Sequence, residues 1–481
     1  MNINKELMLM TDFYEYTMAY AYFKENKHNE IAYFDMFTRK IPDGGGFMIF
    51  NGLHRFMEFV NNFQYDDECI DYLRKTQHFD EDFLAYLKDL RLDIDIWACP
   101  EGTVVFANEP LVTIKGNLIQ AQIVETMLLL CINYATLITT KSVRINNAAQ
   151  GRGVIEMGSR RAHEFTAALE GARAAYIGGC TSSACTAAGE KYGVPITGTT
   201  AHSYIQLHDN ELEAFKSYAR VSPDSCIFLV DTYDTIHSGI PNAIQAAKEE
   251  LLPRGYRLKG VRIDSGDLAY LAKKARKLLD DADMADCKII ASNSLDEEII
   301  EDLIKQEAPI DIFGVGENLI TAKSTPVLGG VYKVVACEKV GVITPKIKMS
   351  ENVEKLTNPG FKKVVRFYDN KTNKAIGDVL MLYDEPIPTE EYVLFDPVAP
   401  WKQKRIVDYT ARILQLPIFE NGKCVYDMPT TQEVRKNCEK EMASLWDEVK
   451  RQHYPHRYYV DYSKKLFDLK NELIKKNTVK I

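Results

Sequence analysis

Short apolar runs separated by helical segments are the feature that most limits the fold of this chain. They recur from about residue 154 onward, and segments such as 267–283 and 295–308 between them have helical periodicity. The runs begin at residues 154 (VIEMG), 174 (AAYIGG), 194 (VPITGT), 226 (CIFLVDT), 258 (LKGVRIDSG), 287 (CKIIASN), 310 (IDIFGVG) and 330 (GVYKVVA). Apolar strands that alternate with helices predict a parallel sheet buried on both faces. About eight such units predict a closed (β/α) barrel, and an open doubly wound sheet is the alternative.

The flanking regions have a different pattern. Residues 11–28 and 54–91 are predicted to be helical, and residues 31–39 alternate as a strand does. A strand-rich stretch follows at 95–116. Beyond about residue 340 the pattern gives way to turns, Lys-rich stretches and a final helix. We expect this last part to pack back on the N-terminal region.

Composition excludes several classes of protein. The formal net charge is −9, which argues against a general nucleic-acid binder, so an anionic ligand would need a local cluster of cations. The first residues contain no apolar signal core, and the uncharged run Thr126–Thr140 is too short to span a bilayer. The ten cysteines form no CxxC pair, so neither a zinc site nor a disulfide framework is indicated. We therefore expect a cytoplasmic protein without a membrane partner, in which Thr126–Thr140 is a buried core helix.

Polar or glycine residues follow seven of the predicted strand ends. In a barrel the ligand site lies at the C-terminal ends of the strands, so these residues are expected to form one layer. They are Gly158–Arg161, Gly179–Ser182, Thr199–Ser203, Asp231–Thr232, Arg262–Asp267, Ser292–Asn293 and Gly314–Gly316.

Two arginines in this layer are candidates for binding anions. Arg160 and Arg262 would bring bidentate cations to one face, which suits phosphate or carboxylate, although salt bridges at the barrel rim are an equal alternative. Gly314 and Gly316 precede a helix start and could present backbone N–H groups to a phosphate, but such a pair is more often a simple turn.

Two acids and a histidine are the other candidates. Asp264 is expected to contact sugar hydroxyls or a phosphate-bound Mg²⁺, and Asp267 to cap the following helix. His202, in a loop of small residues, could be an acid, a base, a nucleophile or a plain hydrogen-bonding group. His163-Glu164 is not part of an HExxH motif and there is no GxxxxGK[ST] loop, so any use of ATP does not involve a Walker-type site.

An ordered set of motifs resembles the nicotinate phosphoribosyltransferase family. The resemblance covers about residues 5–350 and continues more weakly through PKIKMS and LTNPGFKKVVRFYD. The motifs are TDFYEYTM (11–18), FDMFTRKIPDGGGF (34–47), EMGSRRAHE (156–164), GTTAHSY (198–204), VDTYDT (230–235), VRIDSGD (261–267) and FGVGENLIT (313–321).

The resemblance implies an irregular (β/α) barrel with an α+β domain built from N-terminal and C-terminal segments. The implied divisions are an N-terminal domain at 1–150, a barrel at 151–345, and a segment at 346–481 that packs on both. Members transfer ribose 5-phosphate from phosphoribosyl pyrophosphate to nicotinate in NAD synthesis. They couple the transfer to ATP hydrolysis through a transient phosphohistidine, and Mg²⁺ accompanies the phosphorylated substrates.

Matched motifs imply roles for individual residues. His202 matches the phosphorylated histidine, and Arg160 and Arg262 match positions that bind substrate anions. Asp264 matches the acid beside the ribose. Tyr14 matches an aromatic residue that stacks on the pyridine ring and comes from the neighbouring subunit of a homodimer.

The resemblance also covers the remaining candidates. Gly314 and Gly316 match the phosphate-binding turn, and Thr181, Ser182 and Asn293 belong to loops expected to bind substrate. The sequence departs from the related nicotinamide-using enzymes, which have Phe where this chain has Met157. A thioether can still pack on a ring, so the departure leaves the role of Met157 open.

Three other functions compete with nicotinate transfer. Nicotinamide recognition in the relatives uses an Asp, whereas loop 179–183 offers hydroxyl donors and no carboxylate. Quinolinate carries two carboxylates and would need more cations. A catalytically inactive protein that binds phosphoribosyl compounds is the third alternative, against which the presence of His202, Arg262 and Asp264 counts.

Overall fold

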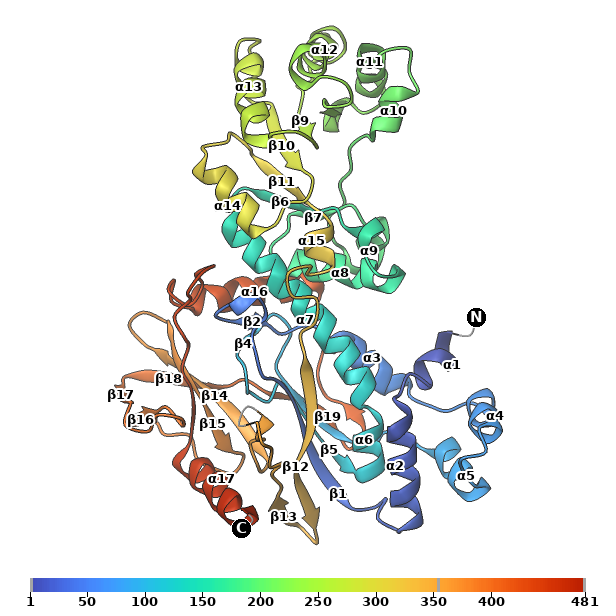
Figure 1. The fold of residues 1–481 in the computed structure, drawn as a ribbon, viewed down its shortest axis with the longest axis vertical. Helices are drawn as coiled ribbons and strands as arrows, with labels where there is room; N and C mark the ends of the chain where they lie inside the picture. Colours follow the sequence, from blue (N-terminus) through green and yellow to red (C-terminus); the bar gives the residue numbers. More distant parts are fainter. Residues whose placement is uncertain (1–2, 353–354, 479–481) are drawn as a thin grey trace. The chain divides into compact units, whose positions relative to one another are not determined.

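The computed structural model describes residues 3–352 and 355–478, which form two compact units. One unit comprises 1–137, 327–429 and 436–481, and the other comprises 138–326 and 430–435. The division between the units falls inside the helix α7 (Glu125–Ala148), near the expected domain boundary at 150, which stays a prediction. Figure 1 labels many of the elements of both units.

The first unit contains a seven-stranded sheet in which every neighbouring pair is antiparallel. Its order is β13-β12-β1-β5-β3-β19-β20. The strands are β1 (Ile31–Thr38), β3 (Asp95–Ala98), β5 (Val112–Asn117), β12 (Gly330–Lys339), β13 (Val342–Pro345), β19 (Leu416–Glu420) and β20 (Lys423–Cys424). Because β19 pairs with β3, the C-terminal segment completes a sheet that the N-terminal segment begins, as expected.

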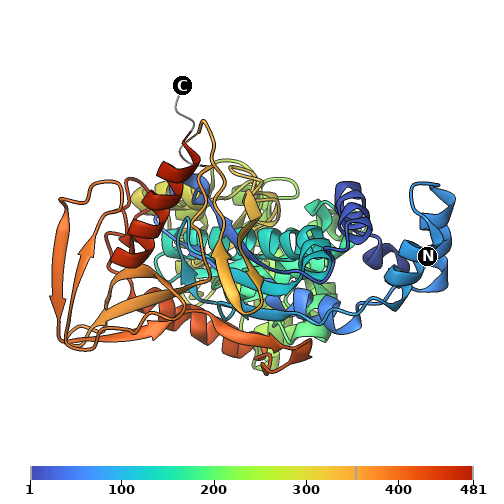
Figure 2. The same ribbon diagram turned by 90° about the horizontal axis from the view of Figure 1, so that it is seen from below.

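A second sheet in this unit was not predicted. It is four-stranded, in the order β18-β14-β15-β21, and Figure 2 shows the red C-terminal helix beside its orange strands. The strands are β14 (Lys362–Asp369), β15 (Ala375–Leu382), β18 (Tyr409–Ile413) and β21 (Val460–Tyr462). Buried Lys362, Lys363 and Arg366 lie in β14, so the charged residues that suggested turns are in fact inside a strand.

Smaller elements complete the first unit. Two further antiparallel pairs are β2 (Met48–Ile49) with β4 (Val104–Val105), and β16 (Glu391–Phe395) with β17 (Gln403–Val407). The helices are α1 (Ile3–Met8), α2 (Phe13–Lys24), α3 (Leu53–Asn62), α4 (Asp67–Lys75), α5 (Glu81–Asp89), α6 (Leu118–Ile123) and α17 (Lys464–Asn477), with a 3-10 turn at Pro42–Gly44. Helix α16 (Thr431–Ser444) crosses the unit boundary.

The second unit contains a six-stranded parallel sheet in the order β7-β6-β11-β10-β9-β8. The strands are β6 (Gly153–Glu156), β7 (Ser182–Ser183), β8 (Ile227–Leu229), β9 (Gly260–Ile263), β10 (Lys288–Ser292) and β11 (Ile312–Val315). The helices are α8 (Phe165–Ile177), α9 (Thr186–Tyr192), α10 (His202–Gln206), α11 (Glu211–Val221), α12 (Ile240–Ala246), α13 (Leu268–Asp280), α14 (Glu297–Lys305) and α15 (Glu317–Ile320). Helical turns of other types lie at Ser159–Arg161, Pro223–Ser225, Thr235–Gly239, Ala247–Leu251 and Leu252–Arg254.

Three of the eight apolar runs are not strands of this parallel sheet. AAYIGG lies at the end of helix α8, where Ala172, Ala174 and Ala175 are all fully buried and the helical period is therefore hidden. In VPITGT, Ile196 forms an isolated bridge with Ser183. GVYKVVA forms part of β12, which pairs antiparallel with β1 in the first unit.

The long apolar helix region is largely buried. Leu118–Ala148 is long and apolar enough to cross a membrane by length and composition, but 72% of its most apolar window is covered by protein. Ile132 and Ile138 are fully buried, as is Thr136, whose hydroxyl donates to the carbonyl of Asn51. The interpretation of this segment as a buried core helix is confirmed.

A buried ionic cluster around Arg366 holds the first unit together. Its guanidinium donates two hydrogen bonds to the Asp378 carboxylate, at 2.8 and 2.7 Å, and one to Glu441, at 3.0 Å. A fourth bond reaches the carbonyl of Val104, and the stacked rings of Phe106 and Tyr458 lie within 6 Å of the guanidinium. Strands β14, β15 and β4 and helix α16 therefore meet at one side chain.

We predict that Arg366→Met lowers the free energy of unfolding by about 3–5 kcal/mol, because it leaves Asp378 buried without its cation and leaves Glu441 with Arg412 alone. Urea denaturation monitored by circular dichroism measures the change. Arg405→Met is the matched control, because the Arg405–Glu391 pair lies on the surface and is worth about 0–1 kcal/mol. Equal losses for the two variants would contradict the prediction.

Candidate active site

The parallel sheet brings six strand ends to one edge. Val315 pairs with Glu156, Ser292 with Gly314, and Arg262 with both Ile290 and Leu229. Because parallel strands point the same way, the residues that end them or follow them lie close together. The polar residues at the ends of β6, β8, β9 and β10 are thus neighbours, and the candidate site is built from them.

Arg262 lies at the centre of this layer. Its guanidinium donates to Asp264 and Ser292, each at 3.3 Å, and to the carbonyl of Thr200 at 2.9 Å. Burial lowers the pKa of Arg262, the nearby carboxylates oppose this change, and the charge of Arg160 adds to it. The two arginines therefore lie close enough to repel each other, and an anion between them would relieve that repulsion.

One donor of Arg262 has no protein acceptor. Its buried Nε makes no hydrogen bond to any described residue, and neither does the buried hydroxyl of Ser159, next to Arg160. Buried donors normally have partners, so these groups indicate a place where a ligand oxygen would be held.

Asp231 holds the loop that carries Asp264. One oxygen of the buried Asp231 carboxylate accepts from the backbone N–H of Asp264, at 2.9 Å, and from the hydroxyl of Ser265. The other oxygen has no hydrogen-bond partner among the described residues, and it lies 3.9 Å from Nε2 of His202. Asp231 thus fixes the loop with one oxygen and faces the site with the other.

His202 begins the short helix α10. Its Nδ1 lies 3.1 Å from the Thr232 hydroxyl, and its Nε2 lies 4.0 Å from Asp264. The side chain is 41% exposed, so a ligand can reach it. If Nδ1 donates to Thr232, then Nε2 carries the free lone pair and faces the two carboxylates.

The interpretation of Asp267 as a capping residue is confirmed. Its carboxylate accepts from the backbone N–H of Tyr270, at 3.0 Å, at the start of α13. Asp264 does not cap this helix: its carboxylate accepts from Ser292 and Arg262. The two acids of the IDSGD segment therefore have different partners, and the expected contact of Asp264 with a ligand stays a prediction.

Gly314 lies inside β11 and faces Met157. A Cβ on Gly314 would be 2.8 Å from the Met157 sulfur and 3.2 Å from Cβ of Ser292, so a side chain there would displace Met157. Gly316 lies one residue beyond the strand and precedes α15. The phosphate-binding role of both glycines stays a prediction, and the structure gives Gly314 a packing role as well.

Glu156 links two loops of the layer. Its side chain is fully buried at the end of β6, where burial raises its pKa and bonds from Ser183 and Gly158 oppose that rise. One carboxylate oxygen accepts from the N–H of Gly158, and the other accepts from the Ser183 hydroxyl. Ser183 in turn accepts from the N–H of Cys185. Glu156 therefore positions the loop with Arg160 and the loop with Ser182.

The remaining candidates of this unit differ in availability. The Thr181 hydroxyl donates to the carbonyl of Val154, at 3.0 Å, so it is already engaged. The Ser182 backbone pairs with β6, but its hydroxyl makes no hydrogen bond to a described residue. Asn293 is exposed, with φ of +93°. This region of backbone space is costly for a residue with a side chain and is enriched at functional sites.

Tyr14 belongs to the first unit. It lies on α2 with its side chain 45% exposed, and burial and the neighbouring Glu125 carboxylate raise its pKa above the usual value. Its exposure leaves the ring available to another chain. The predicted stacking on a substrate in a second subunit stays a prediction.

The carboxylates fit a magnesium–phosphate complex better than a metal bound by protein alone. Within residues 3–352 and 355–478, no group of three or more His, Cys, Asp or Glu residues could hold a metal ion. Asp231 and Asp264 nevertheless lie together, and the free oxygen of Asp231 is buried. Mg²⁺ is commonly held by one or two carboxylates together with substrate phosphates and water. These two residues could therefore hold Mg²⁺ that arrives with a phosphorylated substrate.

Three family models match this chain. They describe the nicotinate phosphoribosyltransferase N-terminal domain (residues 9–133), the nicotinate phosphoribosyltransferase family (153–372) and the C-terminal domain of the same enzyme (361–470). The chain belongs to the nicotinate phosphoribosyltransferase family.

Similar proteins of this family come from distant organisms. Nicotinate phosphoribosyltransferase of Bacillus subtilis is 42% identical over 471 residues, which cover 97% of this chain and 95% of the relative. The Caenorhabditis elegans protein of the same name is 35% identical over 529 residues, covering 97% and 93%. A crystal structure of human nicotinic acid phosphoribosyltransferase matches with a TM-score of 0.83 and 28% identity, covering 96% of this chain and 99% of that one.

Asp231 and Ser292 were expected in the layer of strand ends but without an individual role, and Glu156 was not expected there; all three lie in the candidate site. All three are buried, and each contacts a neighbouring strand or loop. Asp231 and Ser292 did follow predicted strands in the sequence, which was a usable signal. Glu156 lies within its strand, and its partners are distant in sequence, so no local pattern could identify it.

We predict that Glu156→Gln loosens both loops, because an amide cannot accept from Gly158 and Ser183 at the same time. The expected loss of stability is about 1–3 kcal/mol. Hydrogen–deuterium exchange should rise in peptides covering 157–161 and 181–185. Glu190→Gln, an exposed position on α9, is the matched control. Unchanged exchange in both peptides would show that Glu156 does not hold these loops.

Proposed function

We propose that this protein transfers the 5-phosphoribosyl group of phosphoribosyl pyrophosphate to nicotinate, giving nicotinate mononucleotide and pyrophosphate in NAD salvage. The observation that carries the proposal is the network of Arg262, Asp264 and Ser292 at the sheet edge, in a chain of this family. The network offers a cation for an anionic substrate and a carboxylate for a sugar.

The proposed reaction breaks the C1–O bond of the ribose and forms a C1–N bond to the pyridine ring. By analogy with glycoside transfer, positive charge develops on the ribose in the transition state. The Asp264 carboxylate accepts from Ser292, and the Asp264 backbone N–H donates to Asp231. Held in this way, the carboxylate would orient the ribose hydroxyls and stabilise that charge. The ring nitrogen attacks with its own lone pair, so no general base is required.

Negative charge grows on the leaving pyrophosphate. Arg160 and Arg262 are proposed to bind substrate anions, and the unpartnered Nε of Arg262 leaves a donor for this purpose. Mg²⁺ bound with the phosphorylated substrates would supply further positive charge, and Asp231 and Asp264 are the residues that would hold it.

Nicotinate is favoured over nicotinamide by the 179–183 loop. This loop carries hydroxyl groups and no carboxylate, which suits an acid and not an amide that needs an acceptor. The Thr181 hydroxyl already donates to the Val154 carbonyl, so the Ser182 hydroxyl is the better candidate to donate to nicotinate. Nicotinamide transfer and an inactive phosphoribosyl-binding protein remain the alternatives to be tested.

We predict that Arg262→Ala lowers kcat/KM for nicotinate by about one to two decades, because a charge-assisted pair is worth roughly 1.5–3 kcal/mol. A steady-state assay of mononucleotide formation, with nicotinate and nicotinamide in parallel, measures it. Arg257→Ala is the control, because the exposed Arg257–Asp286 pair lies just before β9. Unchanged kinetics for Arg262→Ala would refute the proposed role of Arg262. If the wild-type protein forms no mononucleotide, the alternative of an inactive protein that binds phosphoribosyl compounds is favoured.

ATP is the proposed co-substrate, and His202 is the proposed phosphoryl acceptor. Acid–base work is not needed for the transfer, whereas phosphoryl transfer needs a nucleophile such as imidazole. In that step Nε2 would attack the γ-phosphorus of ATP, the bond to the β-γ bridging oxygen would break, and ADP would leave. Water would later hydrolyse the phosphohistidine. The bond from Nδ1 to Thr232 supports this role for Nε2.

We predict that His202→Ala loses nicotinate-dependent ATP hydrolysis and the acid-labile incorporation of label from γ-labelled ATP. It should keep a slow, ATP-independent synthesis of nicotinate mononucleotide with a raised KM. His237→Ala, at an exposed histidine beyond β8, should behave like the wild type. ATP stimulation that persisted in His202→Ala would overturn the role.

Three further properties complete the proposal. The six-stranded parallel sheet is proposed to form the irregular (β/α) barrel of the family, with the Ile196 bridge extending its β7 edge. The protein is proposed to be a homodimer in which the exposed Tyr14 serves the neighbouring site. A cytoplasmic location is supported by ten cysteines that are all free thiols.

A further inference from the structure

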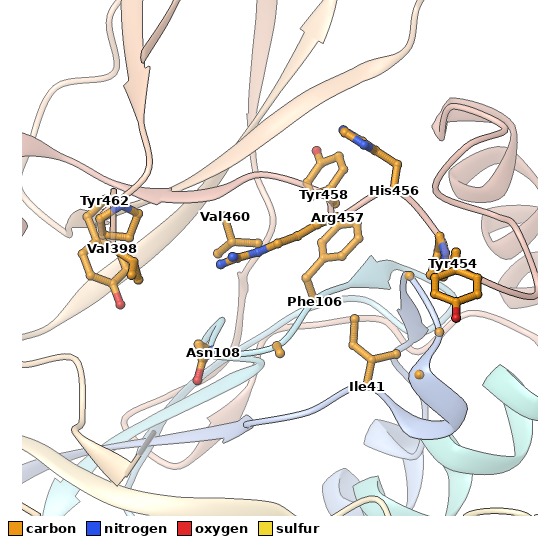
Figure 3. A pocket seen from close by; sticks show the side chains of 16 residues that line it. Ile41, Phe106, Asn108, Val398, Tyr454, His456, Arg457, Tyr458, Val460 and Tyr462 are labelled. Carbon is orange, nitrogen blue, oxygen red and sulfur yellow. The ribbon is translucent and has the colours of Figure 1, made fainter. Parts of the chain in front are cut away.

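A small cavity in the first unit lies between β1, β14, β21 and α17. Its volume is about 250 Å³, just below the roughly 300–1,000 Å³ of pockets that hold drug-sized ligands. It shares Asn108, Val398 and Tyr462 with a larger pocket of about 570 Å³, and Figure 3 shows these three residues on the same side of that pocket. Because the two share these residues, a ligand could enter the small cavity from the larger pocket.

Two lysines face this cavity, and their charges are balanced differently. Lys362 is fully buried and pairs with Asp35 at 2.8 Å, and it also donates to the carbonyls of Asn358 and Gly360. Asp35 therefore balances the charge of Lys362, and each of its three ammonium protons has an acceptor. Among the described residues, no carboxylate lies within ion-pair distance of the second lysine, Lys470.

Lys470 has only neutral partners. Its ammonium donates to Oδ1 of Asn358, at 2.7 Å, and to the Tyr462 hydroxyl, at 3.3 Å, and it lies 5.1 Å from the centre of the Tyr462 ring. These two bonds leave one of its three protons without an acceptor. An anion that joins this partly buried ammonium would take up the free donor and supply the missing counter-charge.

Without a ligand, Lys470 loses its proton at a lower pH than an ordinary lysine does. Burial and, secondarily, the charge of Lys362 lower its pKa to about 8. Tyr462 does not titrate in this range, because burial raises its pKa to about 12. Lys362, Asp35 and Tyr462 are the ionisable groups that face Lys470 from β14, β1 and β21. A bound anion would offset both causes that lower the pKa of Lys470.

The rest of the lining indicates the kind of anion. Phe37, Pro110, Val335 and Val398 supply apolar lining. Asn358 and Tyr462 accept from Lys470, and Lys362 donates to the Asn358 carbonyl, so these polar groups lie together at the Lys470 end. A phosphate would need more donors than this end provides, whereas one carboxylate attached to an apolar body would match both parts. We propose that this cavity is a binding site for a small organic monocarboxylate, which Lys470 holds by an ion pair.

A local chemical probe tests the site in the full-length wild-type protein. The acetylation rate of Lys470 by an N-hydroxysuccinimide ester is measured by peptide mass spectrometry, with and without benzoate. We expect saturating benzoate to lower the acetylation rate of Lys470 at least several-fold, because benzoate occupies the cavity and keeps the amine protonated. Lys465, exposed on the same helix, is the internal control, and benzyl alcohol is the uncharged control ligand. Equal slowing by benzyl alcohol, or no protection by benzoate, would overturn the proposal.

Calorimetry provides the second measurement. Benzoate should show a binding event at pH 7 that Lys470→Met lacks and Lys465→Met keeps, with the folding of each variant checked by circular dichroism. Since the pKa of free Lys470 is about 8, the affinity should fall by up to roughly thirty-fold between pH 7 and pH 9.5. An identical benzoate isotherm for wild type and a folded Lys470→Met would overturn the proposal. These readouts do not depend on transferase activity, so they are independent of the proposed reaction.

Discussion

The burial of one guanidinium constrains the architecture of the first unit more than any other interaction. Arg366 has no exposed surface, so each of its polar atoms needs a partner in the protein. It finds them on Asp378, Glu441 and the backbone of Val104, which lie far apart in the sequence. Strands from the N-terminal and C-terminal parts of the chain must therefore come together before this charge is satisfied. An arrangement without β15 would leave the buried guanidinium without the bidentate carboxylate of Asp378.

In the second unit, the direction of the strands has the same organising effect. Parallel pairing places the ends of β6, β8, β9 and β10 at one edge of the sheet. Hydrogen bonds join the polar residues that lie there. Asp231 holds the loop of Asp264, Ser292 holds its side chain, and Glu156 holds the loops that carry Arg160 and Ser182. The groups that would contact substrate are thus positioned by others that are buried. This arrangement fixes the geometry in advance, which is what stabilisation of a developing charge requires.

Sequence reasoning succeeded where the signal is local and failed where burial hides it. Five of the eight apolar runs are strands of the parallel sheet, and Asp267 is the cap that its place before α13 indicated. The run that ends α8 was wrongly predicted as a strand, because a helix of small residues buried on several sides has no polar face. Strand β14 was missed for the opposite reason, since Lys362 and Arg366 look like surface residues until Asp35 and Asp378 are placed beside them.

By itself, the sequence determined the family, the alternation of strands and helices in the second unit, and which residue types end the strands. These follow from motifs and from the periodicity of apolar residues, both of which are properties of neighbouring positions. Only the tertiary structure decided which sheet β12 joins, that Glu156 links two loops, and that Lys470 faces a cavity without a counter-charge. Each of these depends on pairing between segments distant in sequence. Burial and charge balance arise from those contacts, so they become known only when the chain has folded.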